Sequence, residues 1–178
     1  VTIIALFISC FIGLPLGTFL ATQRFKGRNL LIGIINSLMS LPPVVVGLFV
    51  YINLSRSGPF GWLGILYTPT AMIIAQIILI LPIIAGLTTQ IIEDLQENYN
   101  DLFVSLVTPK VTTIKAYIID ARYSLITVVL AGLAKGISEV GAVIIVGGNI
   151  DHLTRVMTTT ITMETSKGEL SLALALGI

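Results

Sequence analysis

Residues 66–88, LYTPTAMIIAQIILILPIIAGLT, contain no charged side chain. A helix needs about 20 predominantly apolar residues to cross the hydrocarbon core of a bilayer, and this stretch is long enough to do so. Its most polar side chain is the uncharged amide of Gln76, which we expect to hydrogen-bond to a neighbouring helix. The stretch therefore predicts a membrane-spanning helix that packs against other helices.

The composition of the whole chain agrees with that prediction. Of its 178 residues, 55% are hydrophobic and only 11% are charged, whereas a soluble domain carries about 25% charged residues. The net charge is +1 and no run or face is strongly basic, which argues against nucleic-acid binding. The one cysteine, Cys10, lies in an apolar run and is expected to be a small packing residue.

Other apolar stretches flank this one on both sides. We expect further helical segments at 1–22, at 29–53, at 122–147, and from Leu170 onward, the last of them unfinished. Because the chain begins with Val1 and stops inside LALALGI, we expect about one more transmembrane segment beyond these ends, mostly after the last residue. The sequence predicts an all-α polytopic bundle with about five visible helices, forming a single domain over 1–178.

The distribution of basic residues predicts the orientation of the bundle. Cytoplasmic loops of membrane proteins carry an excess of lysine and arginine. The first and third loops hold six basic residues, Arg24, Lys26, Arg28, Lys110, Lys115 and Arg122. The second and fourth loops hold three, Arg56, Arg155 and Lys167. We therefore expect the first and third loops to face the cytoplasm.

The third loop, residues 90–121, is the longest polar stretch of the chain. Its apolar residues recur at spacings of three and four up to Leu106, a pattern typical of an amphipathic helix. Thr108 and Pro109 are expected to act as the N-cap and first residue of a second short helix, at about 109–118. The pattern predicts two cytoplasmic helices joined by a tight turn. Such helices either lie on the membrane or dock a partner.

Two opposite charges interrupt the apolar stretch AGLAKGISEVGAVIIVGGNI, residues 131–150. Lys135 and Glu139 are four residues apart, so on a helix they would share a face and could pair. Charges are expensive inside a bilayer, and three interpretations stay open. The pair is a buried salt bridge that fixes packing, or it lines a pathway or gate, or it relays protons.

Prolines and glycines mark the places where helices are expected to bend or approach closely. Pro42 and Pro43 remove two backbone donors, so the second segment must bend or break there, as a gate or as a plain kink. Two GxxxG pairs predict close helix packing. They are Gly13 with Gly17, and Gly132 with Gly136.

The outward-facing loop carries hydrogen-bond donors suited to an oxyanion. Arg155 and the threonines that include Thr158 could bind a tetrahedral oxyanion, dock a partner protein, or simply be solvated. His152 has no second ligand at metal spacing, and no nucleophile and base are spaced for catalysis. The candidate pathway residues are Pro42, Pro43, Gln76, Lys135, Glu139, Asn149, Arg155 and Thr158.

Six motifs, spread in order over almost the whole chain, resemble one transporter family. The resemblance is to the transmembrane permease subunit of ATP-binding-cassette (ABC) importers of the molybdate, sulfate and tungstate type, with the nearest likeness to tungstate permeases. The motifs are LPPVVVGL (41–48), LSRSGPFG (54–61), TPTAMIIAQ (68–76), ISEVGAVIIVGGNI (137–150), TRVMTTTITMETSKGEL (154–170) and ALALG (173–177).

The resemblance implies that the third loop couples the permease to an ATPase. The family's coupling motif falls on 101–125 in degenerate form, with Asp101 at its glutamate, Leu102 and Phe103 at its two alanines, and Val107 at its glycine. Without that glycine, Thr108 and Pro109 must make the turn. The implied coupling residues are Asp101, Leu102, Phe103, Ser105, Leu106, Val107, Thr108 and Pro109.

The resemblance also implies the partners and the substrate. Two copies of the subunit would form a homodimer in the lipid of the cytoplasmic membrane, with two cytoplasmic ATPase subunits and an extracytoplasmic binding protein that delivers an oxyanion. Tungstate would be the first candidate, with molybdate and sulfate as alternatives. The chain contains no G-x-x-x-x-G-K-[ST] phosphate loop, so we expect no cofactor and no catalysis here, with ATP bound by the partner subunit.

Two other kinds of function are consistent with the residues alone. One is an ion-coupled secondary carrier or channel that uses the intramembrane pair Lys135 and Glu139. The other is a membrane scaffold that transports nothing and recruits cytoplasmic proteins through residues 90–121.

Overall fold

The computed structural model describes residues 1–105 and 109–177. Within these ranges the chain folds into helices and contains no strand, which confirms the predicted all-α class. The helices are α1 (Thr2–Thr22), α2 (Arg28–Met39), α3 (Pro43–Leu54), the 3₁₀ helix η1 (Gly61–Leu63), α4 (Pro69–Ser105), α5 (Lys110–Asp120), α6 (Arg122–Ser138), α7 (Gly141–Gly147), α8 (Met157–Lys167) and α9 (Leu170–Gly177).

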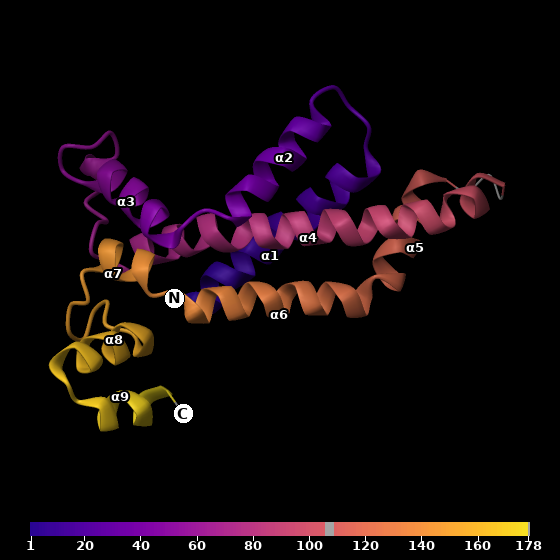
Figure 1. Ribbon diagram of the computed structural model, residues 1–178. Coiled ribbons are helices and arrows are strands. Elements are labelled where there is room, and N and C mark those ends of the chain that lie inside the picture. The colour runs from indigo at the N-terminus through magenta and orange to yellow at the C-terminus, as the bar shows by residue number, and fades with distance from the viewer. Residues whose placement is uncertain (106–108, 178) are drawn as a thin grey trace.

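The long helix α4 is the element around which the others are arranged. It contacts α1, α2, α3, α5, α6 and α7, and Figure 1 shows α1 and α6 running alongside it. Its 37 residues correspond to a length of about 55 Å, whereas the hydrocarbon core is about 30 Å thick. One helix therefore joins the membrane interior to the aqueous end that carries α5.

Glycines allow α1 and α6 to approach α4 closely. A Cβ atom on Gly17 of α1 would lie 2.6 Å from the carbonyl oxygen of Ala85. The Thr89 hydroxyl is 2.8 Å from the Ala85 carbonyl oxygen and 3.3 Å from that of Gly17, and it can donate to either. On α6, a Cβ on Gly136 would lie 2.9 Å from the Ile80 side chain. Both predicted GxxxG pairs face α4, and this confirms their packing role.

Two helices are long and apolar enough to cross a membrane without interruption. They are α1 and the first 31 residues of α4, Pro69–Tyr99. Two bent pairs also qualify if each is taken as one span, α2 with α3 at 102° and α5 with α6 at 66°. The described residues thus supply two to four spans, as expected for a multi-pass membrane protein.

The predicted break at the two prolines is confirmed. Pro42 is the N-cap of α3, with an extended backbone at φ −61° and ψ 129°, and Pro43 is the first residue of that helix. Proline is well suited to the first helical position because its missing N–H has no intrahelical partner there. The chain therefore turns sharply between α2 and α3.

Two predictions about helix boundaries were wrong. The segment 122–147 is not one helix, because α6 ends at Ser138 and Glu139 has an extended backbone at φ −79° and ψ 119°. The first coupling helix is not separate either, since α4 continues from the membrane to Ser105. Between Thr88 and Ser105 there is no glycine or proline to stop it.

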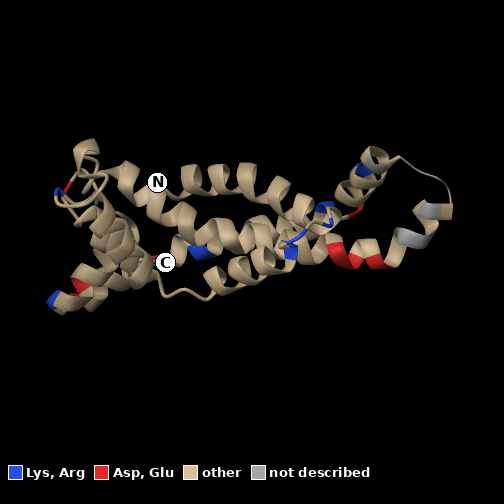
Figure 2. Ribbon diagram, turned by 90° about the horizontal axis from the view of Figure 1, so that it is seen from above, with Lys and Arg blue, Asp and Glu red and all other residues tan. Residues whose placement is uncertain are grey.

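The charged residues are concentrated towards the two ends of the molecule (Figure 2). Between them the outward faces are largely apolar, as Phe7 and Phe11 of α1 and Phe49 of α3 illustrate with exposed fractions of 74%, 77% and 62%. An exposed apolar band between polar ends is typical of a protein surrounded by lipid.

The glycine contacts between α1 and α4 generate a stability prediction. Gly17→Ala should destabilise the protein by about 1–3 kcal/mol, because the added methyl group meets the backbone of α4. Gly33→Ala in α2 is the matched control, since a Cβ there meets nothing within 4 Å, and it should be neutral or slightly stabilising. Thermal unfolding in detergent measures both variants. Equal melting temperatures for the two would contradict the close approach.

Candidate functional site

The far end of α4 and the short helix α5 form an arm, residues 90–105 and 109–121, which we call the coupling arm. Three aromatic rings hold it together. The ring centroids of Phe103 and Tyr117 are 5.5 Å apart in an edge-on arrangement, and those of Tyr99 and Phe103 are 6.4 Å apart. Such pairs contribute about 0.5–1.5 kcal/mol beyond their buried area. The arm is therefore packed internally, and α5 is held against α4.

Tyr117 anchors α5 to the rest of the bundle. Its side chain is only 3% exposed and packs in one apolar cluster with Ala21 of α1, Ile92 of α4 and Ala121. Burial raises the pKa of the Tyr117 hydroxyl above its usual value. A movement of α5 is consequently transmitted to the ends of α1, α4 and α6.

An open cavity of about 540 Å³ lies between the two helices of the arm. It exposes apolar surface to solvent, including Leu102, whose side chain is 53% exposed. A concave apolar surface beyond the membrane segment is suited to a side chain of another protein. The lining residues are Tyr99, Leu102, Phe103, Ala116, Tyr117, Ile119, Asp120, Arg122 and Tyr123.

An ion pair joins the first loop to the base of this arm. The Arg28 guanidinium pairs with the Glu93 carboxylate through Nη2 and also donates from Nε to the Leu20 carbonyl at 2.7 Å. Both side chains are partly buried, which reduces screening by solvent. The ion pair fixes α2 and α4 at the end that we predict to be cytoplasmic.

The predicted coupling residues fall on this arm where the structure describes them. Leu102 and Phe103 line its cavity, and the Ser105 hydroxyl donates to the Leu102 carbonyl at 2.8 Å. Pro109 is the N-cap of α5, so the helix begins one position later than predicted. Leu106, Val107, Thr108 and the side chain of Asp101 lie outside the described residues.

A second, smaller cavity of about 150 Å³ lies inside the bundle and brings together Gln76, Glu139 and Thr158, three of the predicted pathway residues. Gln76 is 3% exposed. Its amide nitrogen donates to the Gly136 carbonyl at 3.1 Å and to the Thr2 hydroxyl at 3.2 Å. The predicted hydrogen bond between helices is confirmed, while the amide oxygen of Gln76 has no partner among the described residues.

Glu139 is a helix-capping residue and does not pair with Lys135. Its side chain is 5% exposed, and its Oε1 accepts a hydrogen bond of 2.8 Å from the backbone N–H of Ala142 in the first turn of α7. In the described part of the chain Lys135 and Glu139 form no ion pair, which corrects the pairing we predicted. The reason is the end of α6, which takes Glu139 off the helix face of Lys135.

The charge of this cavity disfavours a resident anion. Its lining includes the Glu139 carboxylate and neither lysine nor arginine, so far as the described residues go. A carboxylate at close range repels an anion strongly where the dielectric is low. The cavity is therefore better suited to passage or to water than to tight anion binding.

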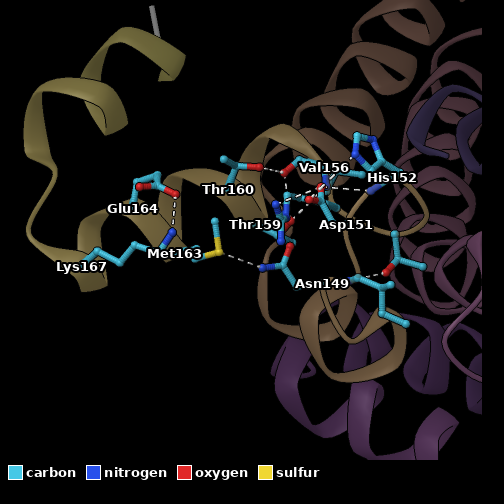
Figure 3. Close-up of polar contacts among 12 residues, drawn as sticks. Asn149, Asp151, His152, Val156, Thr159, Thr160, Met163, Glu164 and Lys167 are labelled. Atoms are coloured by element: carbon cyan, nitrogen blue, oxygen red, sulfur yellow. Dashed lines mark hydrogen bonds and ion pairs between the residues drawn. The ribbon is translucent and has the colours of Figure 1, made fainter.

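Asn149 and Arg155 belong to a hydrogen-bonded loop between α7 and α8 (Figure 3), whereas Thr158 is in the first turn of α8. Arg155 pairs through Nη1 with Asp151 at 2.9 Å, and the Asn149 amide points to the sulfur of Met163 at 3.7 Å. The Thr154 hydroxyl donates to the Gly147 carbonyl at 2.6 Å and accepts from the Ile150 N–H at 2.8 Å. The loop is thus held by its own side chains, and Arg155 already has one acidic partner.

Several contributing residues were not predicted from the sequence. Thr2, Glu93 and Tyr117 have ordinary local patterns, and their partners are distant along the chain, as with the 65 positions between Arg28 and Glu93. Only the acidic character of 93–97 hinted at a charged partner. As for metals, the described residues contain no cluster of three or more His, Cys, Asp or Glu that could hold an ion.

A helical bundle with two to four membrane spans, a cavity that contains Gln76 and Glu139, and a packed arm at one end is the architecture of a multi-pass membrane protein. Residues 13–178 match the family described as "Binding-protein-dependent transport system inner membrane component". The chain belongs to this family and is a multi-pass permease subunit of an ABC importer in the cell membrane.

Several proteins that are similar to this chain are named as permeases. The chain is 42% identical to the tungstate uptake system permease protein TupB of Peptoclostridium acidaminophilum, over 96% of this chain and 75% of that protein. It is 36% identical to a probable anion ABC transporter permease protein of Haloferax volcanii, over 97% and 77%. It is 26% identical to the molybdenum transport system permease protein ModB of Azotobacter vinelandii, over 81% and 67%.

The capping role of Glu139 predicts that its hydrogen-bond acceptor, and not its negative charge, contributes to stability. Glu139→Gln keeps an acceptor for the Ala142 N–H and should leave the melting temperature in detergent close to that of the wild type. Glu139→Ala removes the acceptor and should cost about 0.5–2 kcal/mol of stability. If the two variants unfold alike, the hydrogen bond does not contribute as inferred.

Proposed function

We propose that two copies of this chain form the transmembrane pathway of an importer that takes up an oxyanion, with tungstate as the substrate. Two cytoplasmic ATPase subunits would dock on the two coupling arms, and an extracytoplasmic binding protein would deliver the anion. The observation that supports tungstate is the 42% identity, over almost the whole chain, to a tungstate uptake permease.

The mechanism follows from the continuity of α4. The helix carries Leu102 and Phe103 at the arm and Gln76 at the internal cavity. A force applied to the arm would therefore reach the cavity along one helix, which contains Pro82 between these two sites. Closure of an ATPase dimer would move the two arms together, and the bundle would respond by opening its other end.

The cavity supports a mechanism in which the binding protein captures the anion and the permease only lets it pass. Because Glu139 lines it and no cation does among the described residues, the anion would be held tightly outside the permease, on the binding protein. Weak binding along the pathway favours release to the cytoplasm. Selection among tungstate, molybdate and sulfate would then depend largely on the binding protein.

The alternative of an ion-coupled carrier loses its structural basis. That reading required Lys135 and Glu139 to act as a pair in one helix. Instead Glu139 is engaged at the start of α7, and α6 ends before it. The coupling arm, by contrast, is the element that an ATPase-driven permease requires.

Docking of the ATPase on the coupling arm is tested by a matched pair of substitutions. Leu102→Lys should reduce co-purification of the ATPase by about ten-fold or more, because it places a charge in the apolar cavity of the arm. Leu153→Lys is the control. Leu153 is 54% exposed, almost the same as Leu102 at 53%, but Leu153 lies at the opposite end of the molecule. Equal recovery of ATPase with both variants would exclude the arm as the docking site.

The substrate is tested by transport in proteoliposomes that contain the permease and ATPase, with the binding protein outside and ATP inside. Tungstate should accumulate with ATP and fail to accumulate with ADP. Calorimetric titration of the binding protein with tungstate, molybdate and sulfate should rank tungstate first. Uptake that persists with ADP would contradict the proposed ATP-driven mechanism. Preferential binding of sulfate would contradict tungstate as the substrate.

A further inference from the structure

An apolar groove of about 370 Å³ runs along the outer surface of α6 beside α1. Six apolar side chains line it, and one basic side chain, Arg122, stands at its end. The apolar members on α6 lie three, four, seven and eight positions after Arg122, so they share one helix face over about 12 Å. The apolar lining residues are Leu14, Ile118, Leu125, Ile126, Val129 and Leu130.

The charge of Arg122 is available for an anionic ligand. Arg122 is an exposed residue at the first position of α6, whose first turn contains no acidic residue. Its guanidinium donates to the Tyr123 hydroxyl at 3.3 Å and lies 4.7 Å from the centre of that ring. No carboxylate among the described residues lies within 4.0 Å of the Arg122 guanidinium. Asp120 lines the cavity of the coupling arm, which Arg122 also lines.

We infer that this groove binds an anionic phospholipid, with the phosphate on Arg122 and an acyl chain along α6. A basic side chain at the membrane–water boundary followed by an apolar groove complements both parts of such a lipid. Tyr123, whose side chain is 70% exposed, is suited to the headgroup level, where tyrosine is enriched.

A second copy of the chain fits this face less well. A symmetric dimer in a membrane has its two-fold axis along the membrane normal, so both copies place Arg122 at the same depth. A contact centred on this groove would therefore bring two guanidinium groups together in a partly apolar setting, which is unfavourable. An anionic lipid provides the missing counter-charge and covers the apolar face at once.

The site lies next to the coupling arm, because Arg122 lines both the groove and the cavity of that arm. Ala121 alone separates α5 from α6. A lipid held by Arg122 would therefore fix the depth at which the arm leaves the membrane. This inference does not depend on which anion the importer transports.

The test uses the intact complex in nanodiscs that contain equal amounts of phosphatidylglycerol and phosphatidylcholine, with the retained lipids quantified by mass spectrometry after delipidation. The wild type should retain phosphatidylglycerol preferentially. Arg122→Gln should lower the retained phosphatidylglycerol about five-fold, and Val129→Trp should lower retention of both lipids by filling the groove. Lys115→Gln, an exposed lysine of α5 outside the groove, is the control and should retain as much as the wild type.

Equal retention by Arg122→Gln and the wild type, or an equal loss in Lys115→Gln, would overturn the site. A further variant, Ile126→Cys in a Cys10→Ala background, distinguishes lipid from a second copy. Efficient disulfide-linked dimers through position 126 would assign the face to the partner subunit and overturn the inference. Size-exclusion profiles identical to that of the wild type show that each variant is folded.

Discussion

The bundle depends on the close approach of helix backbones to α4. In a bilayer there is little hydrophobic gain from bringing apolar helices together, so association relies on packing and on hydrogen bonds between helices. Gly17 on one side and Gly136 on the other let α1 and α6 reach the surface of α4. The hydrogen bonds from Thr89 and Gln76 then join the same helices.

The same constraint explains where polar groups occur inside the bundle. A buried polar group without a partner is costly, and two of the buried polar side chains, Gln76 and Glu139, connect helices or end one. Gln76 donates to α6 and α1. Glu139 accepts from the first turn of α7, where the chain must leave helical geometry. Both side chains line the same cavity, whose remaining lining is largely apolar.

In the proposed mechanism the coupling arm would transmit force across the membrane boundary. A flexible link between arm and membrane would absorb the movement of a motor protein. In this chain α4 is uninterrupted through that boundary, the aromatic contacts of Phe103 hold α5 against it, and the Arg28–Glu93 pair ties in the first loop. A lipid on Arg122 would add support at the same depth, from the outer surface of α6.

The class of protein was predictable from the sequence because it follows from local composition. Long apolar runs such as 66–88, the prolines at 42 and 43, and the GxxxG spacings each have a direct physical consequence for helices in a bilayer, and the structure confirms them. The amphipathic pattern of 90–121 predicted helices there, whereas the coupling role of these helices came from the family resemblance.

Other features were decided by tertiary contacts. A spacing of four indicated that Lys135 and Glu139 could pair, yet α6 ends between them and the Glu139 carboxylate accepts from a backbone N–H of the next helix. The meeting of Gln76, Glu139 and Thr158 in one cavity, and of Arg28 with Glu93, joins residues far apart in the chain. Helical periodicity reports which residues share a face of one helix. It contains no information on which faces meet, and that depends on the packing of the whole bundle.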